Sequence, residues 1–154
     1  MDKELLKQQV CAAIDASAAK IKAIADGIAD EPELGFKEVK TSAKVAAFMR
    51  ELGLETQTGL AINGVKGRAH GGKLGPTAAV LGELDAVGCP ESAKADPLTG
   101  AAHACGHNLQ IATMLGAACG IMKSGVLKEL AGDVVFFGVP AEEYIEIEKK
   151  KKLL

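Results

Sequence analysis

Three short clusters of polar residues in the second half of the chain carry the side chains that could do chemistry. They are residues 83–85 (ELD), residues 103–108 (HACGHN) and residues 140–143 (PAEE). Together they offer carboxylates, a thiol and imidazoles, without a matching number of basic residues. A divalent cation is the simplest partner for such a set, because it neutralises carboxylates and accepts sulfur and nitrogen ligands.

The spacing inside the second cluster favours two ligands for one ion. Cys105 and His107 are separated by a single glycine. On a regular helix two such residues would point about 200° apart. On loop backbone they can point the same way, and Gly106 permits unusual dihedral angles. Both side chains could then reach one ion, at about 2.3 Å for sulfur and about 2.0–2.1 Å for nitrogen if the ion is zinc.

The carboxylates of the other two clusters have complementary uses. Adjacent side chains such as Glu142 and Glu143 are expected to diverge, so one could bind metal while the other takes a proton from the attacking water. Asp85 could orient a histidine ligand or bind the ion directly. Each cluster alone also has an ordinary interpretation, as a turn or a solvated helix start. Their shared position in the predicted fold favours the metal site.

A nucleophilic cysteine is a competing interpretation of the second cluster. Cys105 would then be activated by His103 or His107. These residues are too close in sequence for the usual dyad assembled across a fold, and no oxyanion donor is evident. We therefore prefer metal ligation.

The other cysteines and histidine have simpler predicted positions. His70 lies in a glycine-rich loop and is expected to be exposed, whereas Cys11 and Cys119 lie among apolar residues of predicted helices and are expected to be buried. Cys89 lies in a loop and has no obvious partner.

The elements that must position the clusters form a strand–helix–strand unit. Apolar residues at 77–82 and 133–138 predict two buried strands, and residues 108–123 predict a helix whose small residues permit close packing on a sheet. Such a unit makes the two strands parallel. All three clusters then lie at the carboxyl edge of the sheet, where open α/β folds bind their ligands.

The first half of the chain predicts two helices and a hairpin. An amphipathic helix spans about residues 3–29 and ends before Pro32, and a second helix starts with Thr41 or Ser42 as its N-cap and stops at Gly53. Strands follow at 55–58 and 60–69, with a tight turn at Asn63-Gly64.

Composition limits the kind of protein. The chain has 154 residues, 48% of them hydrophobic and 25% charged, with a net charge of -2. The length fits a single domain. The nearly balanced charge argues against a protein that coats nucleic acid or an anionic membrane. No apolar run reaches a membrane span, no secretory signal is evident, and the four cysteines do not suggest a disulfide framework. We expect a cytoplasmic protein.

At these motifs the sequence resembles the M20 metallopeptidase and amidohydrolase family, in the branch of aminobenzoyl-glutamate, N-acyl amino-acid and auxin-conjugate hydrolases. The resemblance covers about residues 20–143. Its motifs are PELGFKEVKTSAKVAAFMRELGLE, GGKLGPTAAVLGELDAV, HACGHN and GDVVFFGVPAEE. HACGH followed by PAEE is highly specific, and Glu83 and Asn108 fit the aminobenzoyl-glutamate-like subgroup.

The resemblance implies a metal-dependent hydrolase of amide bonds in N-acyl or aminobenzoyl amino acids or small peptides. It implies an α/β catalytic domain of the zinc-exopeptidase kind, with three helix–sheet–helix layers and a mixed, mostly parallel sheet. The complete family site holds two divalent ions, zinc or manganese. By motif, Cys105, His107 and Glu143 match metal ligands, Glu142 matches the general base, and Asp85 matches the acidic residue that follows the strand.

The chain also departs from the family pattern. Tyr144 follows PAEE where relatives usually have glycine. Family chains are longer, with a lid and dimerisation domain and further histidine ligands, so residues 1–154 match only part of a catalytic domain. We therefore expect little activity from this chain, at most one weakly held ion, and self-association through an exposed sheet edge. A non-catalytic metal-binding or interaction module is the alternative, which turnover would distinguish.

Overall fold

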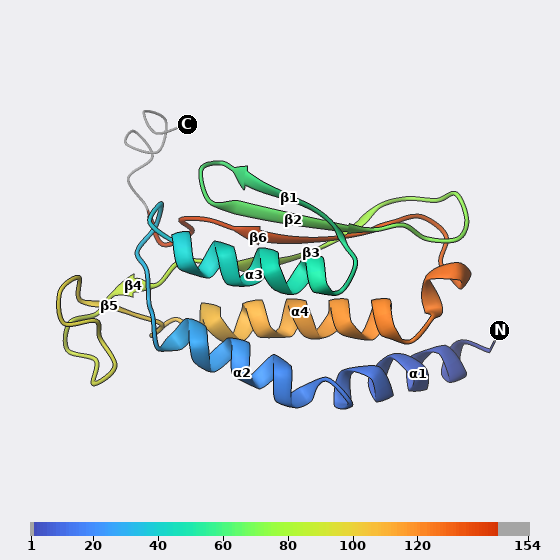
Figure 1. The fold of residues 1–154 in the computed structure, drawn as a ribbon, viewed down its shortest axis with the longest axis horizontal. Coiled ribbons are helices and arrows are strands. Elements are labelled where there is room, and N and C mark those ends of the chain that lie inside the picture. Colours follow the sequence, from blue (N-terminus) through green and yellow to red (C-terminus); the bar gives the residue numbers. More distant parts are fainter. Residues whose placement is uncertain (1, 145–154) are drawn as a thin grey trace.

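The structure is a computed structural model that describes residues 2–144. Its elements in chain order, drawn in Figure 1, are α1 (Lys3–Asp15), α2 (Ala18–Ala29), α3 (Val39–Glu51), β1 (Glu55–Leu60), β2 (Gly64–Ala69), β3 (Ala78–Glu83), β4 (Val87–Gly88), β5 (Ala101–Ala102), α4 (His107–Lys123), the 3-10 helix η1 (Val126–Glu129) and β6 (Val134–Val139). Within residues 2–144 no helix combines the length and the apolar character needed to cross a membrane.

Four strands form the main sheet in the order β1-β2-β6-β3. β3 and β6 are parallel and are joined through α4, so the predicted strand–helix–strand unit is confirmed. β1 pairs with β2 and β2 pairs with β6 in antiparallel register. The sheet is therefore mixed as expected, but only one of its three pairings is parallel.

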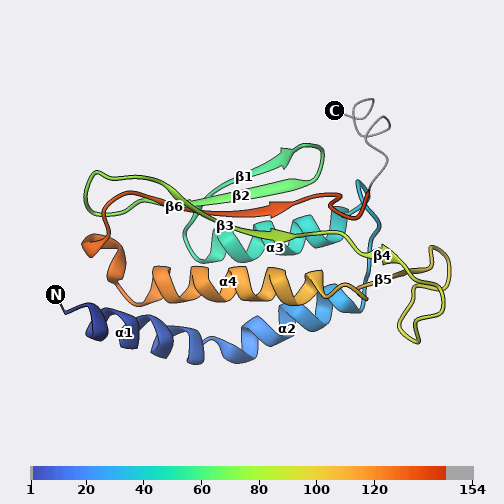
Figure 2. The same cartoon turned by 180° about the vertical axis from the view of Figure 1, so that it is seen from behind.

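The helices of residues 2–144 lie on one face of this sheet. α3 packs on β1 and β2, α4 packs on β3 and β6, and α1 and α2 pack on α4. Figures 1 and 2 show the resulting layers, with the sheet on one side and α1 and α2 farthest from it. The α/β class is confirmed. The described residues provide no helical layer on the opposite face, where the side chain of Leu81 is 58% exposed.

Close helix packing depends on glycines of α4. A Cβ atom at Gly120 would lie 2.8 Å from Val10 and 2.9 Å from Ile14, both on α1. Gly116 likewise faces Ile21 of α2. These small residues were expected to pack on the sheet, but the structure turns them toward α1 and α2. The sheet side of α4 instead uses larger side chains such as Ile111, which lies over Gly82 of β3.

The predicted helix over 3–29 is wrong in one respect, because it breaks into α1 and α2 at Ser17. The Ser17 hydroxyl donates to the Ala13 carbonyl and accepts from the Lys123 ammonium, which satisfies a buried polar side chain. Cys119 is buried as predicted, but Cys11 is exposed. The physical reason is that α1 lies at the periphery and none of its residues is buried.

The second predicted helix is α3 of the structure. It begins at Val39, before the predicted N-cap at Thr41 or Ser42. Its free backbone N–H groups are bound by a carboxylate from outside the helix, because Lys40 N and Thr41 N both donate to Glu33. No local pattern near Thr41 reveals a capping residue that lies eight residues upstream of it. The predicted stop at Gly53 is confirmed, since this residue adopts the left-handed conformation at φ 80°.

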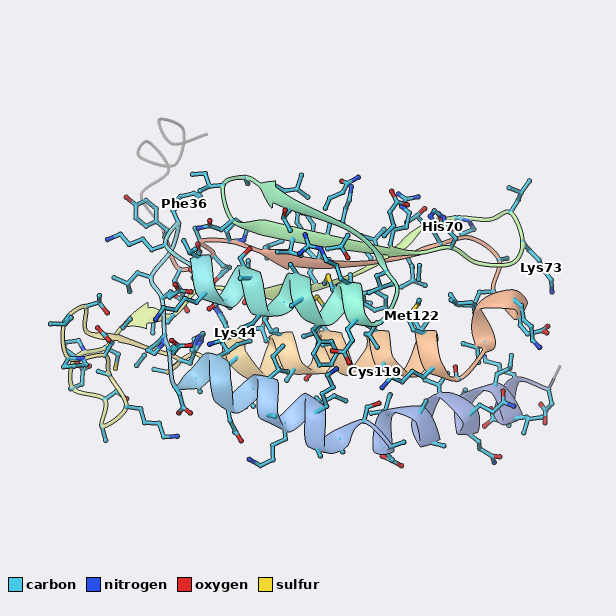
Figure 3. All side chains as sticks on the ribbon, viewed as in Figure 1. Phe36, Lys44, His70, Lys73, Cys119 and Met122 are labelled. Atoms are coloured by element: carbon cyan, nitrogen blue, oxygen red, sulfur yellow. The ribbon has the colours of Figure 1, made fainter. Side chains whose placement is uncertain are left out.

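His70 lies at the far end of the sheet and is exposed, as predicted (Figure 3). Its Nε2 lies 3.0 Å from Glu55 Oε2 and its Nδ1 lies 3.2 Å from Asp133 Oδ2. The hydrogen bond to the Glu55 carboxylate is the main cause that raises the pKa of His70, and Asp133 acts in the same direction.

We expect His70 to stabilise the fold only at low pH. A raised pKa means that the folded state binds the proton more tightly, so the stabilisation is present below about pH 6.5 and disappears as the pH rises through the folded-state pKa. In urea unfolding, His70→Gln should therefore lower the midpoint at pH 5.5 and leave it unchanged at pH 9. A loss of equal size at both values would contradict the charge-based explanation.

Candidate metal centre

The three polar clusters meet at one end of the β3–β6 pair. Glu83 is the last residue of β3 and is in register with Val139, the last residue of β6. The cluster after each strand therefore emerges at the same edge, and His107 begins α4 beside them. The predicted convergence at the carboxyl edge of the parallel pair is confirmed by this register.

His107 is the centre of the cluster and is 2% exposed. Its Nδ1 lies 2.9 Å from the backbone carbonyl oxygen of Asp85. A carbonyl only accepts, so Nδ1 carries a hydrogen and donates it. This bond fixes the ring and directs Nε2 toward the carboxylates.

Three carboxylate oxygens surround that second nitrogen. Nε2 lies 2.8 Å from Glu83 Oε2, 3.7 Å from Glu143 Oε1 and 3.8 Å from Glu142 Oε2. Nitrogen and oxygen atoms in such an arrangement are ligands that a divalent ion accepts.

Two groups of three side chains bring their ligand atoms within 4.8 Å of one another. One consists of Cys105, His107 and Glu143, and the other consists of Glu83, His107 and Glu142. Glu142 and Glu143 were expected to diverge, but both approach the same histidine nitrogen. They differ in exposure, because the side chain of Glu142 is 52% exposed and that of Glu143 is 27% exposed.

Asp85 contacts two members of the cluster, His107 and Glu143. It is fully buried, and its Oδ2 accepts a hydrogen bond of 2.9 Å from the backbone N–H of Glu143. Its Oδ1 lies 3.3 Å from His107 Nδ1. Asp85 belongs to neither group of candidate ligands among residues 2–144. Of the two roles considered for it, these contacts support orientation of its neighbours.

The sequence reasoning missed a buried carboxylate, that of Glu38. Its Oε1 accepts a 2.8 Å hydrogen bond from the backbone N–H of Ala141, and its Oε2 accepts a 2.9 Å hydrogen bond from the side-chain amide of Asn63. Ala141 adopts φ 56°, a conformation that costs energy for any residue with a Cβ. Glu38 thus holds the backbone that precedes Glu142. Its position in a charged turn before α3 looks like an ordinary surface site.

Gly106 allows the turn that places Cys105 beside His107. It adopts φ 89° at the N-cap of α4, so the glycine between the two residues is needed, as the spacing indicated. The Cys105 side chain faces Glu143, and the hydrogen bond with this carboxylate is the main cause that raises the pKa of the thiol. Nucleophilic attack and metal ligation both need the thiolate, so this shift does not distinguish them. The grouping of Cys105 with His107 and Glu143, whose ligand atoms lie within 4.8 Å of one another, is the arrangement that the metal interpretation expects.

His103 does not join the candidate ligands. Both of its ring nitrogens are buried, and neither has a hydrogen-bond partner within residues 2–144. Burial is the main cause that lowers the pKa of His103 to about 4, and His107 acts in the same direction. The imidazole is therefore neutral at physiological pH.

Known proteins are similar to this chain in sequence, and solved structures are similar to it in fold. The chain is 35% identical over 120 residues to thermostable carboxypeptidase 2 of Saccharolobus solfataricus, which covers 75% of this chain and 30% of that protein. It is 35% identical over 119 residues to IAA-amino acid hydrolase ILR1-like 4 of Arabidopsis thaliana, covering 75% of this chain and 26% of that protein. No protein-family model matches the chain.

Two solved structures align with most of the chain. A putative aminohydrolase from methicillin-resistant Staphylococcus aureus aligns with a TM-score of 0.78 and 28% identity, over 94% of this chain and 40% of that one. The YXEP protein of Bacillus subtilis, described as a dinuclear metal-binding peptidase of the M20 family, aligns with a TM-score of 0.73 and 26% identity, over 90% and 40%.

The fold is of the α/β class, and the relatives that match the chain are named as peptidases and amidohydrolases. More specifically, the chain belongs to the M20 family of metallopeptidases and amidohydrolases. It spans about 30% of the length of the first curated relatives that it matches.

Proposed function

We propose that the chain contributes to metal-dependent hydrolysis of amide bonds in N-acyl or aminobenzoyl amino acids or small peptides. The observation that carries this proposal is the arrangement around His107, whose Nε2 faces carboxylates while Cys105 and Glu143 lie within ligand distance of one another. Relatives named as a carboxypeptidase and an amino-acid conjugate hydrolase support the same reaction class.

Cys105, His107 and Glu143 are the proposed ligands of a divalent ion, zinc or manganese. A thiolate, an imidazole and a carboxylate suit such ions. When bound, the ion polarises the amide carbonyl and stabilises the negative charge that develops on its oxygen. The two candidate groups within residues 2–144 both contain His107, so we expect them to hold one ion between them and not two.

Glu142 is the proposed general base. Its side chain is the more exposed of the two glutamates, so it is the one that can face substrate and water. Its carboxylate would take a proton from the attacking water and pass it to the departing amine nitrogen. Asp85 accepts a hydrogen bond from the backbone N–H of Glu143, and its other oxygen faces His107. Its proposed role is to position these two metal ligands.

Replacing Cys105 should weaken metal binding. Cys105→Ser substitutes a weaker ligand for a thiolate, so we expect at least a tenfold loss of zinc affinity, measured by competition with a chromophoric chelator. Cys11→Ser is the matched control, because Cys11 is also an exposed free cysteine but lies on α1. Equal zinc affinity in both variants would contradict the ligand assignment.

The proposed reaction is tested by assaying the purified chain, loaded with zinc or manganese, on N-acetyl amino acids and on aminobenzoyl-glutamate. Turnover that a chelator abolishes and added metal restores would support the hydrolase. Tight metal binding without turnover on any of these substrates would favour the alternative, a metal-binding or interaction module.

A further inference from the structure

A tight turn at residues 34–37, just before α3, contacts both loops that carry carboxylates of the candidate metal centre (Figure 3). The backbone N–H of Lys37 donates a 2.9 Å hydrogen bond to the Leu34 carbonyl, which closes the turn. On the side of β3, Leu34 forms a parallel bridge with Ala86, which follows the buried aspartate of the site. On the side of β6, the turn packs against residues 141–144, which include both glutamates.

The residues of this turn are placed against its own conformational preference. Phe36 is the third residue of the turn and adopts φ 62°. A turn with a positive φ at its third position favours glycine there, because a Cβ makes the left-handed conformation costly. The glycine of this turn is instead its second residue, Gly35, which does not adopt a positive φ. The turn alone would favour the opposite order of these two residues.

Contacts with the loop after β6 explain both choices. A Cβ at Gly35 would lie 3.1 Å from the Cβ atoms of Ala141 and Tyr144, so a larger residue at this position would push the loop away. The Phe36 ring packs edge to face on the Tyr144 ring, with the two centroids 5.6 Å apart. A costly backbone conformation persists only where the surrounding contacts hold it. The order of glycine and phenylalanine therefore suits the neighbouring loop and not the turn itself.

The residues on either side of the turn anchor it. The Glu33 carboxylate accepts hydrogen bonds from two backbone N–H groups in the first turn of α3. The Glu33 carbonyl also accepts a 2.7 Å hydrogen bond from the backbone N–H of Ala86, in the loop after β3. Glu38, after the turn, accepts from the backbone N–H of Ala141, in the loop after β6. Residues 33–38 thus join the start of α3 to both loops.

We propose that residues 33–38 are a clamp that fixes the loops after β3 and β6 relative to each other, and that Gly35 and Phe36 are positioning residues of the metal centre. Neither residue binds the ion, because both act through the backbone of the loop that carries Glu143. Removing a group that orients a metal ligand typically lowers metal affinity by about 10–100-fold. This inference rests on the proposed function, because it takes Glu143 to be a ligand, but the hold on the loops can be measured without metal.

Amide hydrogen exchange of the metal-free chain reports on the loop directly. The backbone N–H groups of Ala141 and Glu143 donate to the side chains of Glu38 and Asp85, so they exchange slowly while the loop stays in place. Gly35→Val places a branched side chain against the loop. We expect it to accelerate exchange of these two amides about tenfold or more relative to the amides of β6. Zinc affinity, measured by competition with a chromophoric chelator, should fall at least tenfold.

Gly67→Val is the matched control for the loss of stability. A Cβ at Gly67 of β2 would lie 2.9 Å from the sulfur of Met49 on α3, so this variant crowds the packing between β2 and α3 and not the loops. It should lower the urea midpoint without a selective acceleration at Ala141 and Glu143. At matched fractions of folded protein, its zinc affinity should equal that of the wild-type chain.

Two substitutions at Phe36 separate the turn conformation from packing. Phe36→Ala and Phe36→Gly both remove the ring that contacts Tyr144, but only glycine adopts φ 62° without cost. Phe36→Gly should therefore keep zinc affinity and amide protection closer to the wild-type values than Phe36→Ala does. A role in packing alone gives the opposite order, because glycine also removes the Cβ and makes the unfolded chain more flexible.

Three results would overturn the proposal. Equal exchange rates at Ala141 and Glu143 in Gly35→Val and in Gly67→Val would show that the turn does not hold the loop. Faster exchange with unchanged zinc affinity would show that the turn holds the loop but does not position the ligands. Better retention of zinc in Phe36→Ala than in Phe36→Gly would reduce Phe36 to packing. Failure of the wild-type chain to bind zinc would instead count against the proposed function, and the exchange rates would still decide whether residues 33–38 clamp the loops.

Discussion

Replacing Glu142 by glutamine is expected to lower kcat by about 10²–10⁴ and to leave metal occupancy unchanged. Glutamine keeps the size of the side chain but cannot accept a proton from water. Because Glu142 is the more exposed of the two glutamates, its charge is the less important one for holding a cation. Because we expect little activity from this chain alone, the variant is made in a full-length relative that carries this segment. The measurements are steady-state kinetics on an N-acetyl amino acid and elemental analysis of metal after gel filtration.

Glu143→Gln is the matched control, one residue farther along the same loop. It removes a charge from the group that also contains Cys105 and His107, so we expect metal to be lost together with activity. If Glu142→Gln loses metal while Glu143→Gln retains it, the two roles are reversed. If both variants keep metal and full activity, neither glutamate belongs to the reacting site.

The convergence of the three clusters could be predicted because it depends on one local rule. A strand, a helix and a strand of these lengths make a parallel pair, and parallel strands end at the same edge. Glu83 and Val139 are in register at that edge, as the rule requires. Residues that follow the two strands are then neighbours in space, and this does not depend on how the other elements pack.

Contacts that depend on distant packing could not be predicted in this way. The face that Gly116 and Gly120 present is set by where α1 and α2 lie, and no periodicity in residues 108–123 carries that information. The break at Ser17 likewise follows from contacts with Ala13 and with Lys123, which is remote in sequence. The expectation that Glu142 and Glu143 diverge assumed regular backbone, whereas Ala141 before them adopts φ 56°.

Removing the Glu38 side chain is expected to damage stability and metal binding together. Glu38→Ala leaves the buried Ala141 N–H and the partly buried Asn63 amide without their acceptor. Each orphaned group costs about 1–3 kcal/mol, so the free energy of unfolding should fall by about 2–5 kcal/mol. The loss of the Ala141 bond also releases the backbone that carries Glu142 and Glu143, so zinc affinity should fall at least tenfold under conditions where the chain remains folded.

Asn63→Ala separates these two effects. It removes only the other arm of the Glu38 contact and leaves the Ala141 bond in place. We expect a loss of about 1–2 kcal/mol in unfolding free energy with unchanged zinc affinity. Glu38→Gln keeps one acceptor oxygen and should fall between the two variants. If zinc affinity is the same in Glu38→Ala and in Asn63→Ala at matched fractions of folded protein, Glu38 supports the fold but does not position the residues of the metal centre.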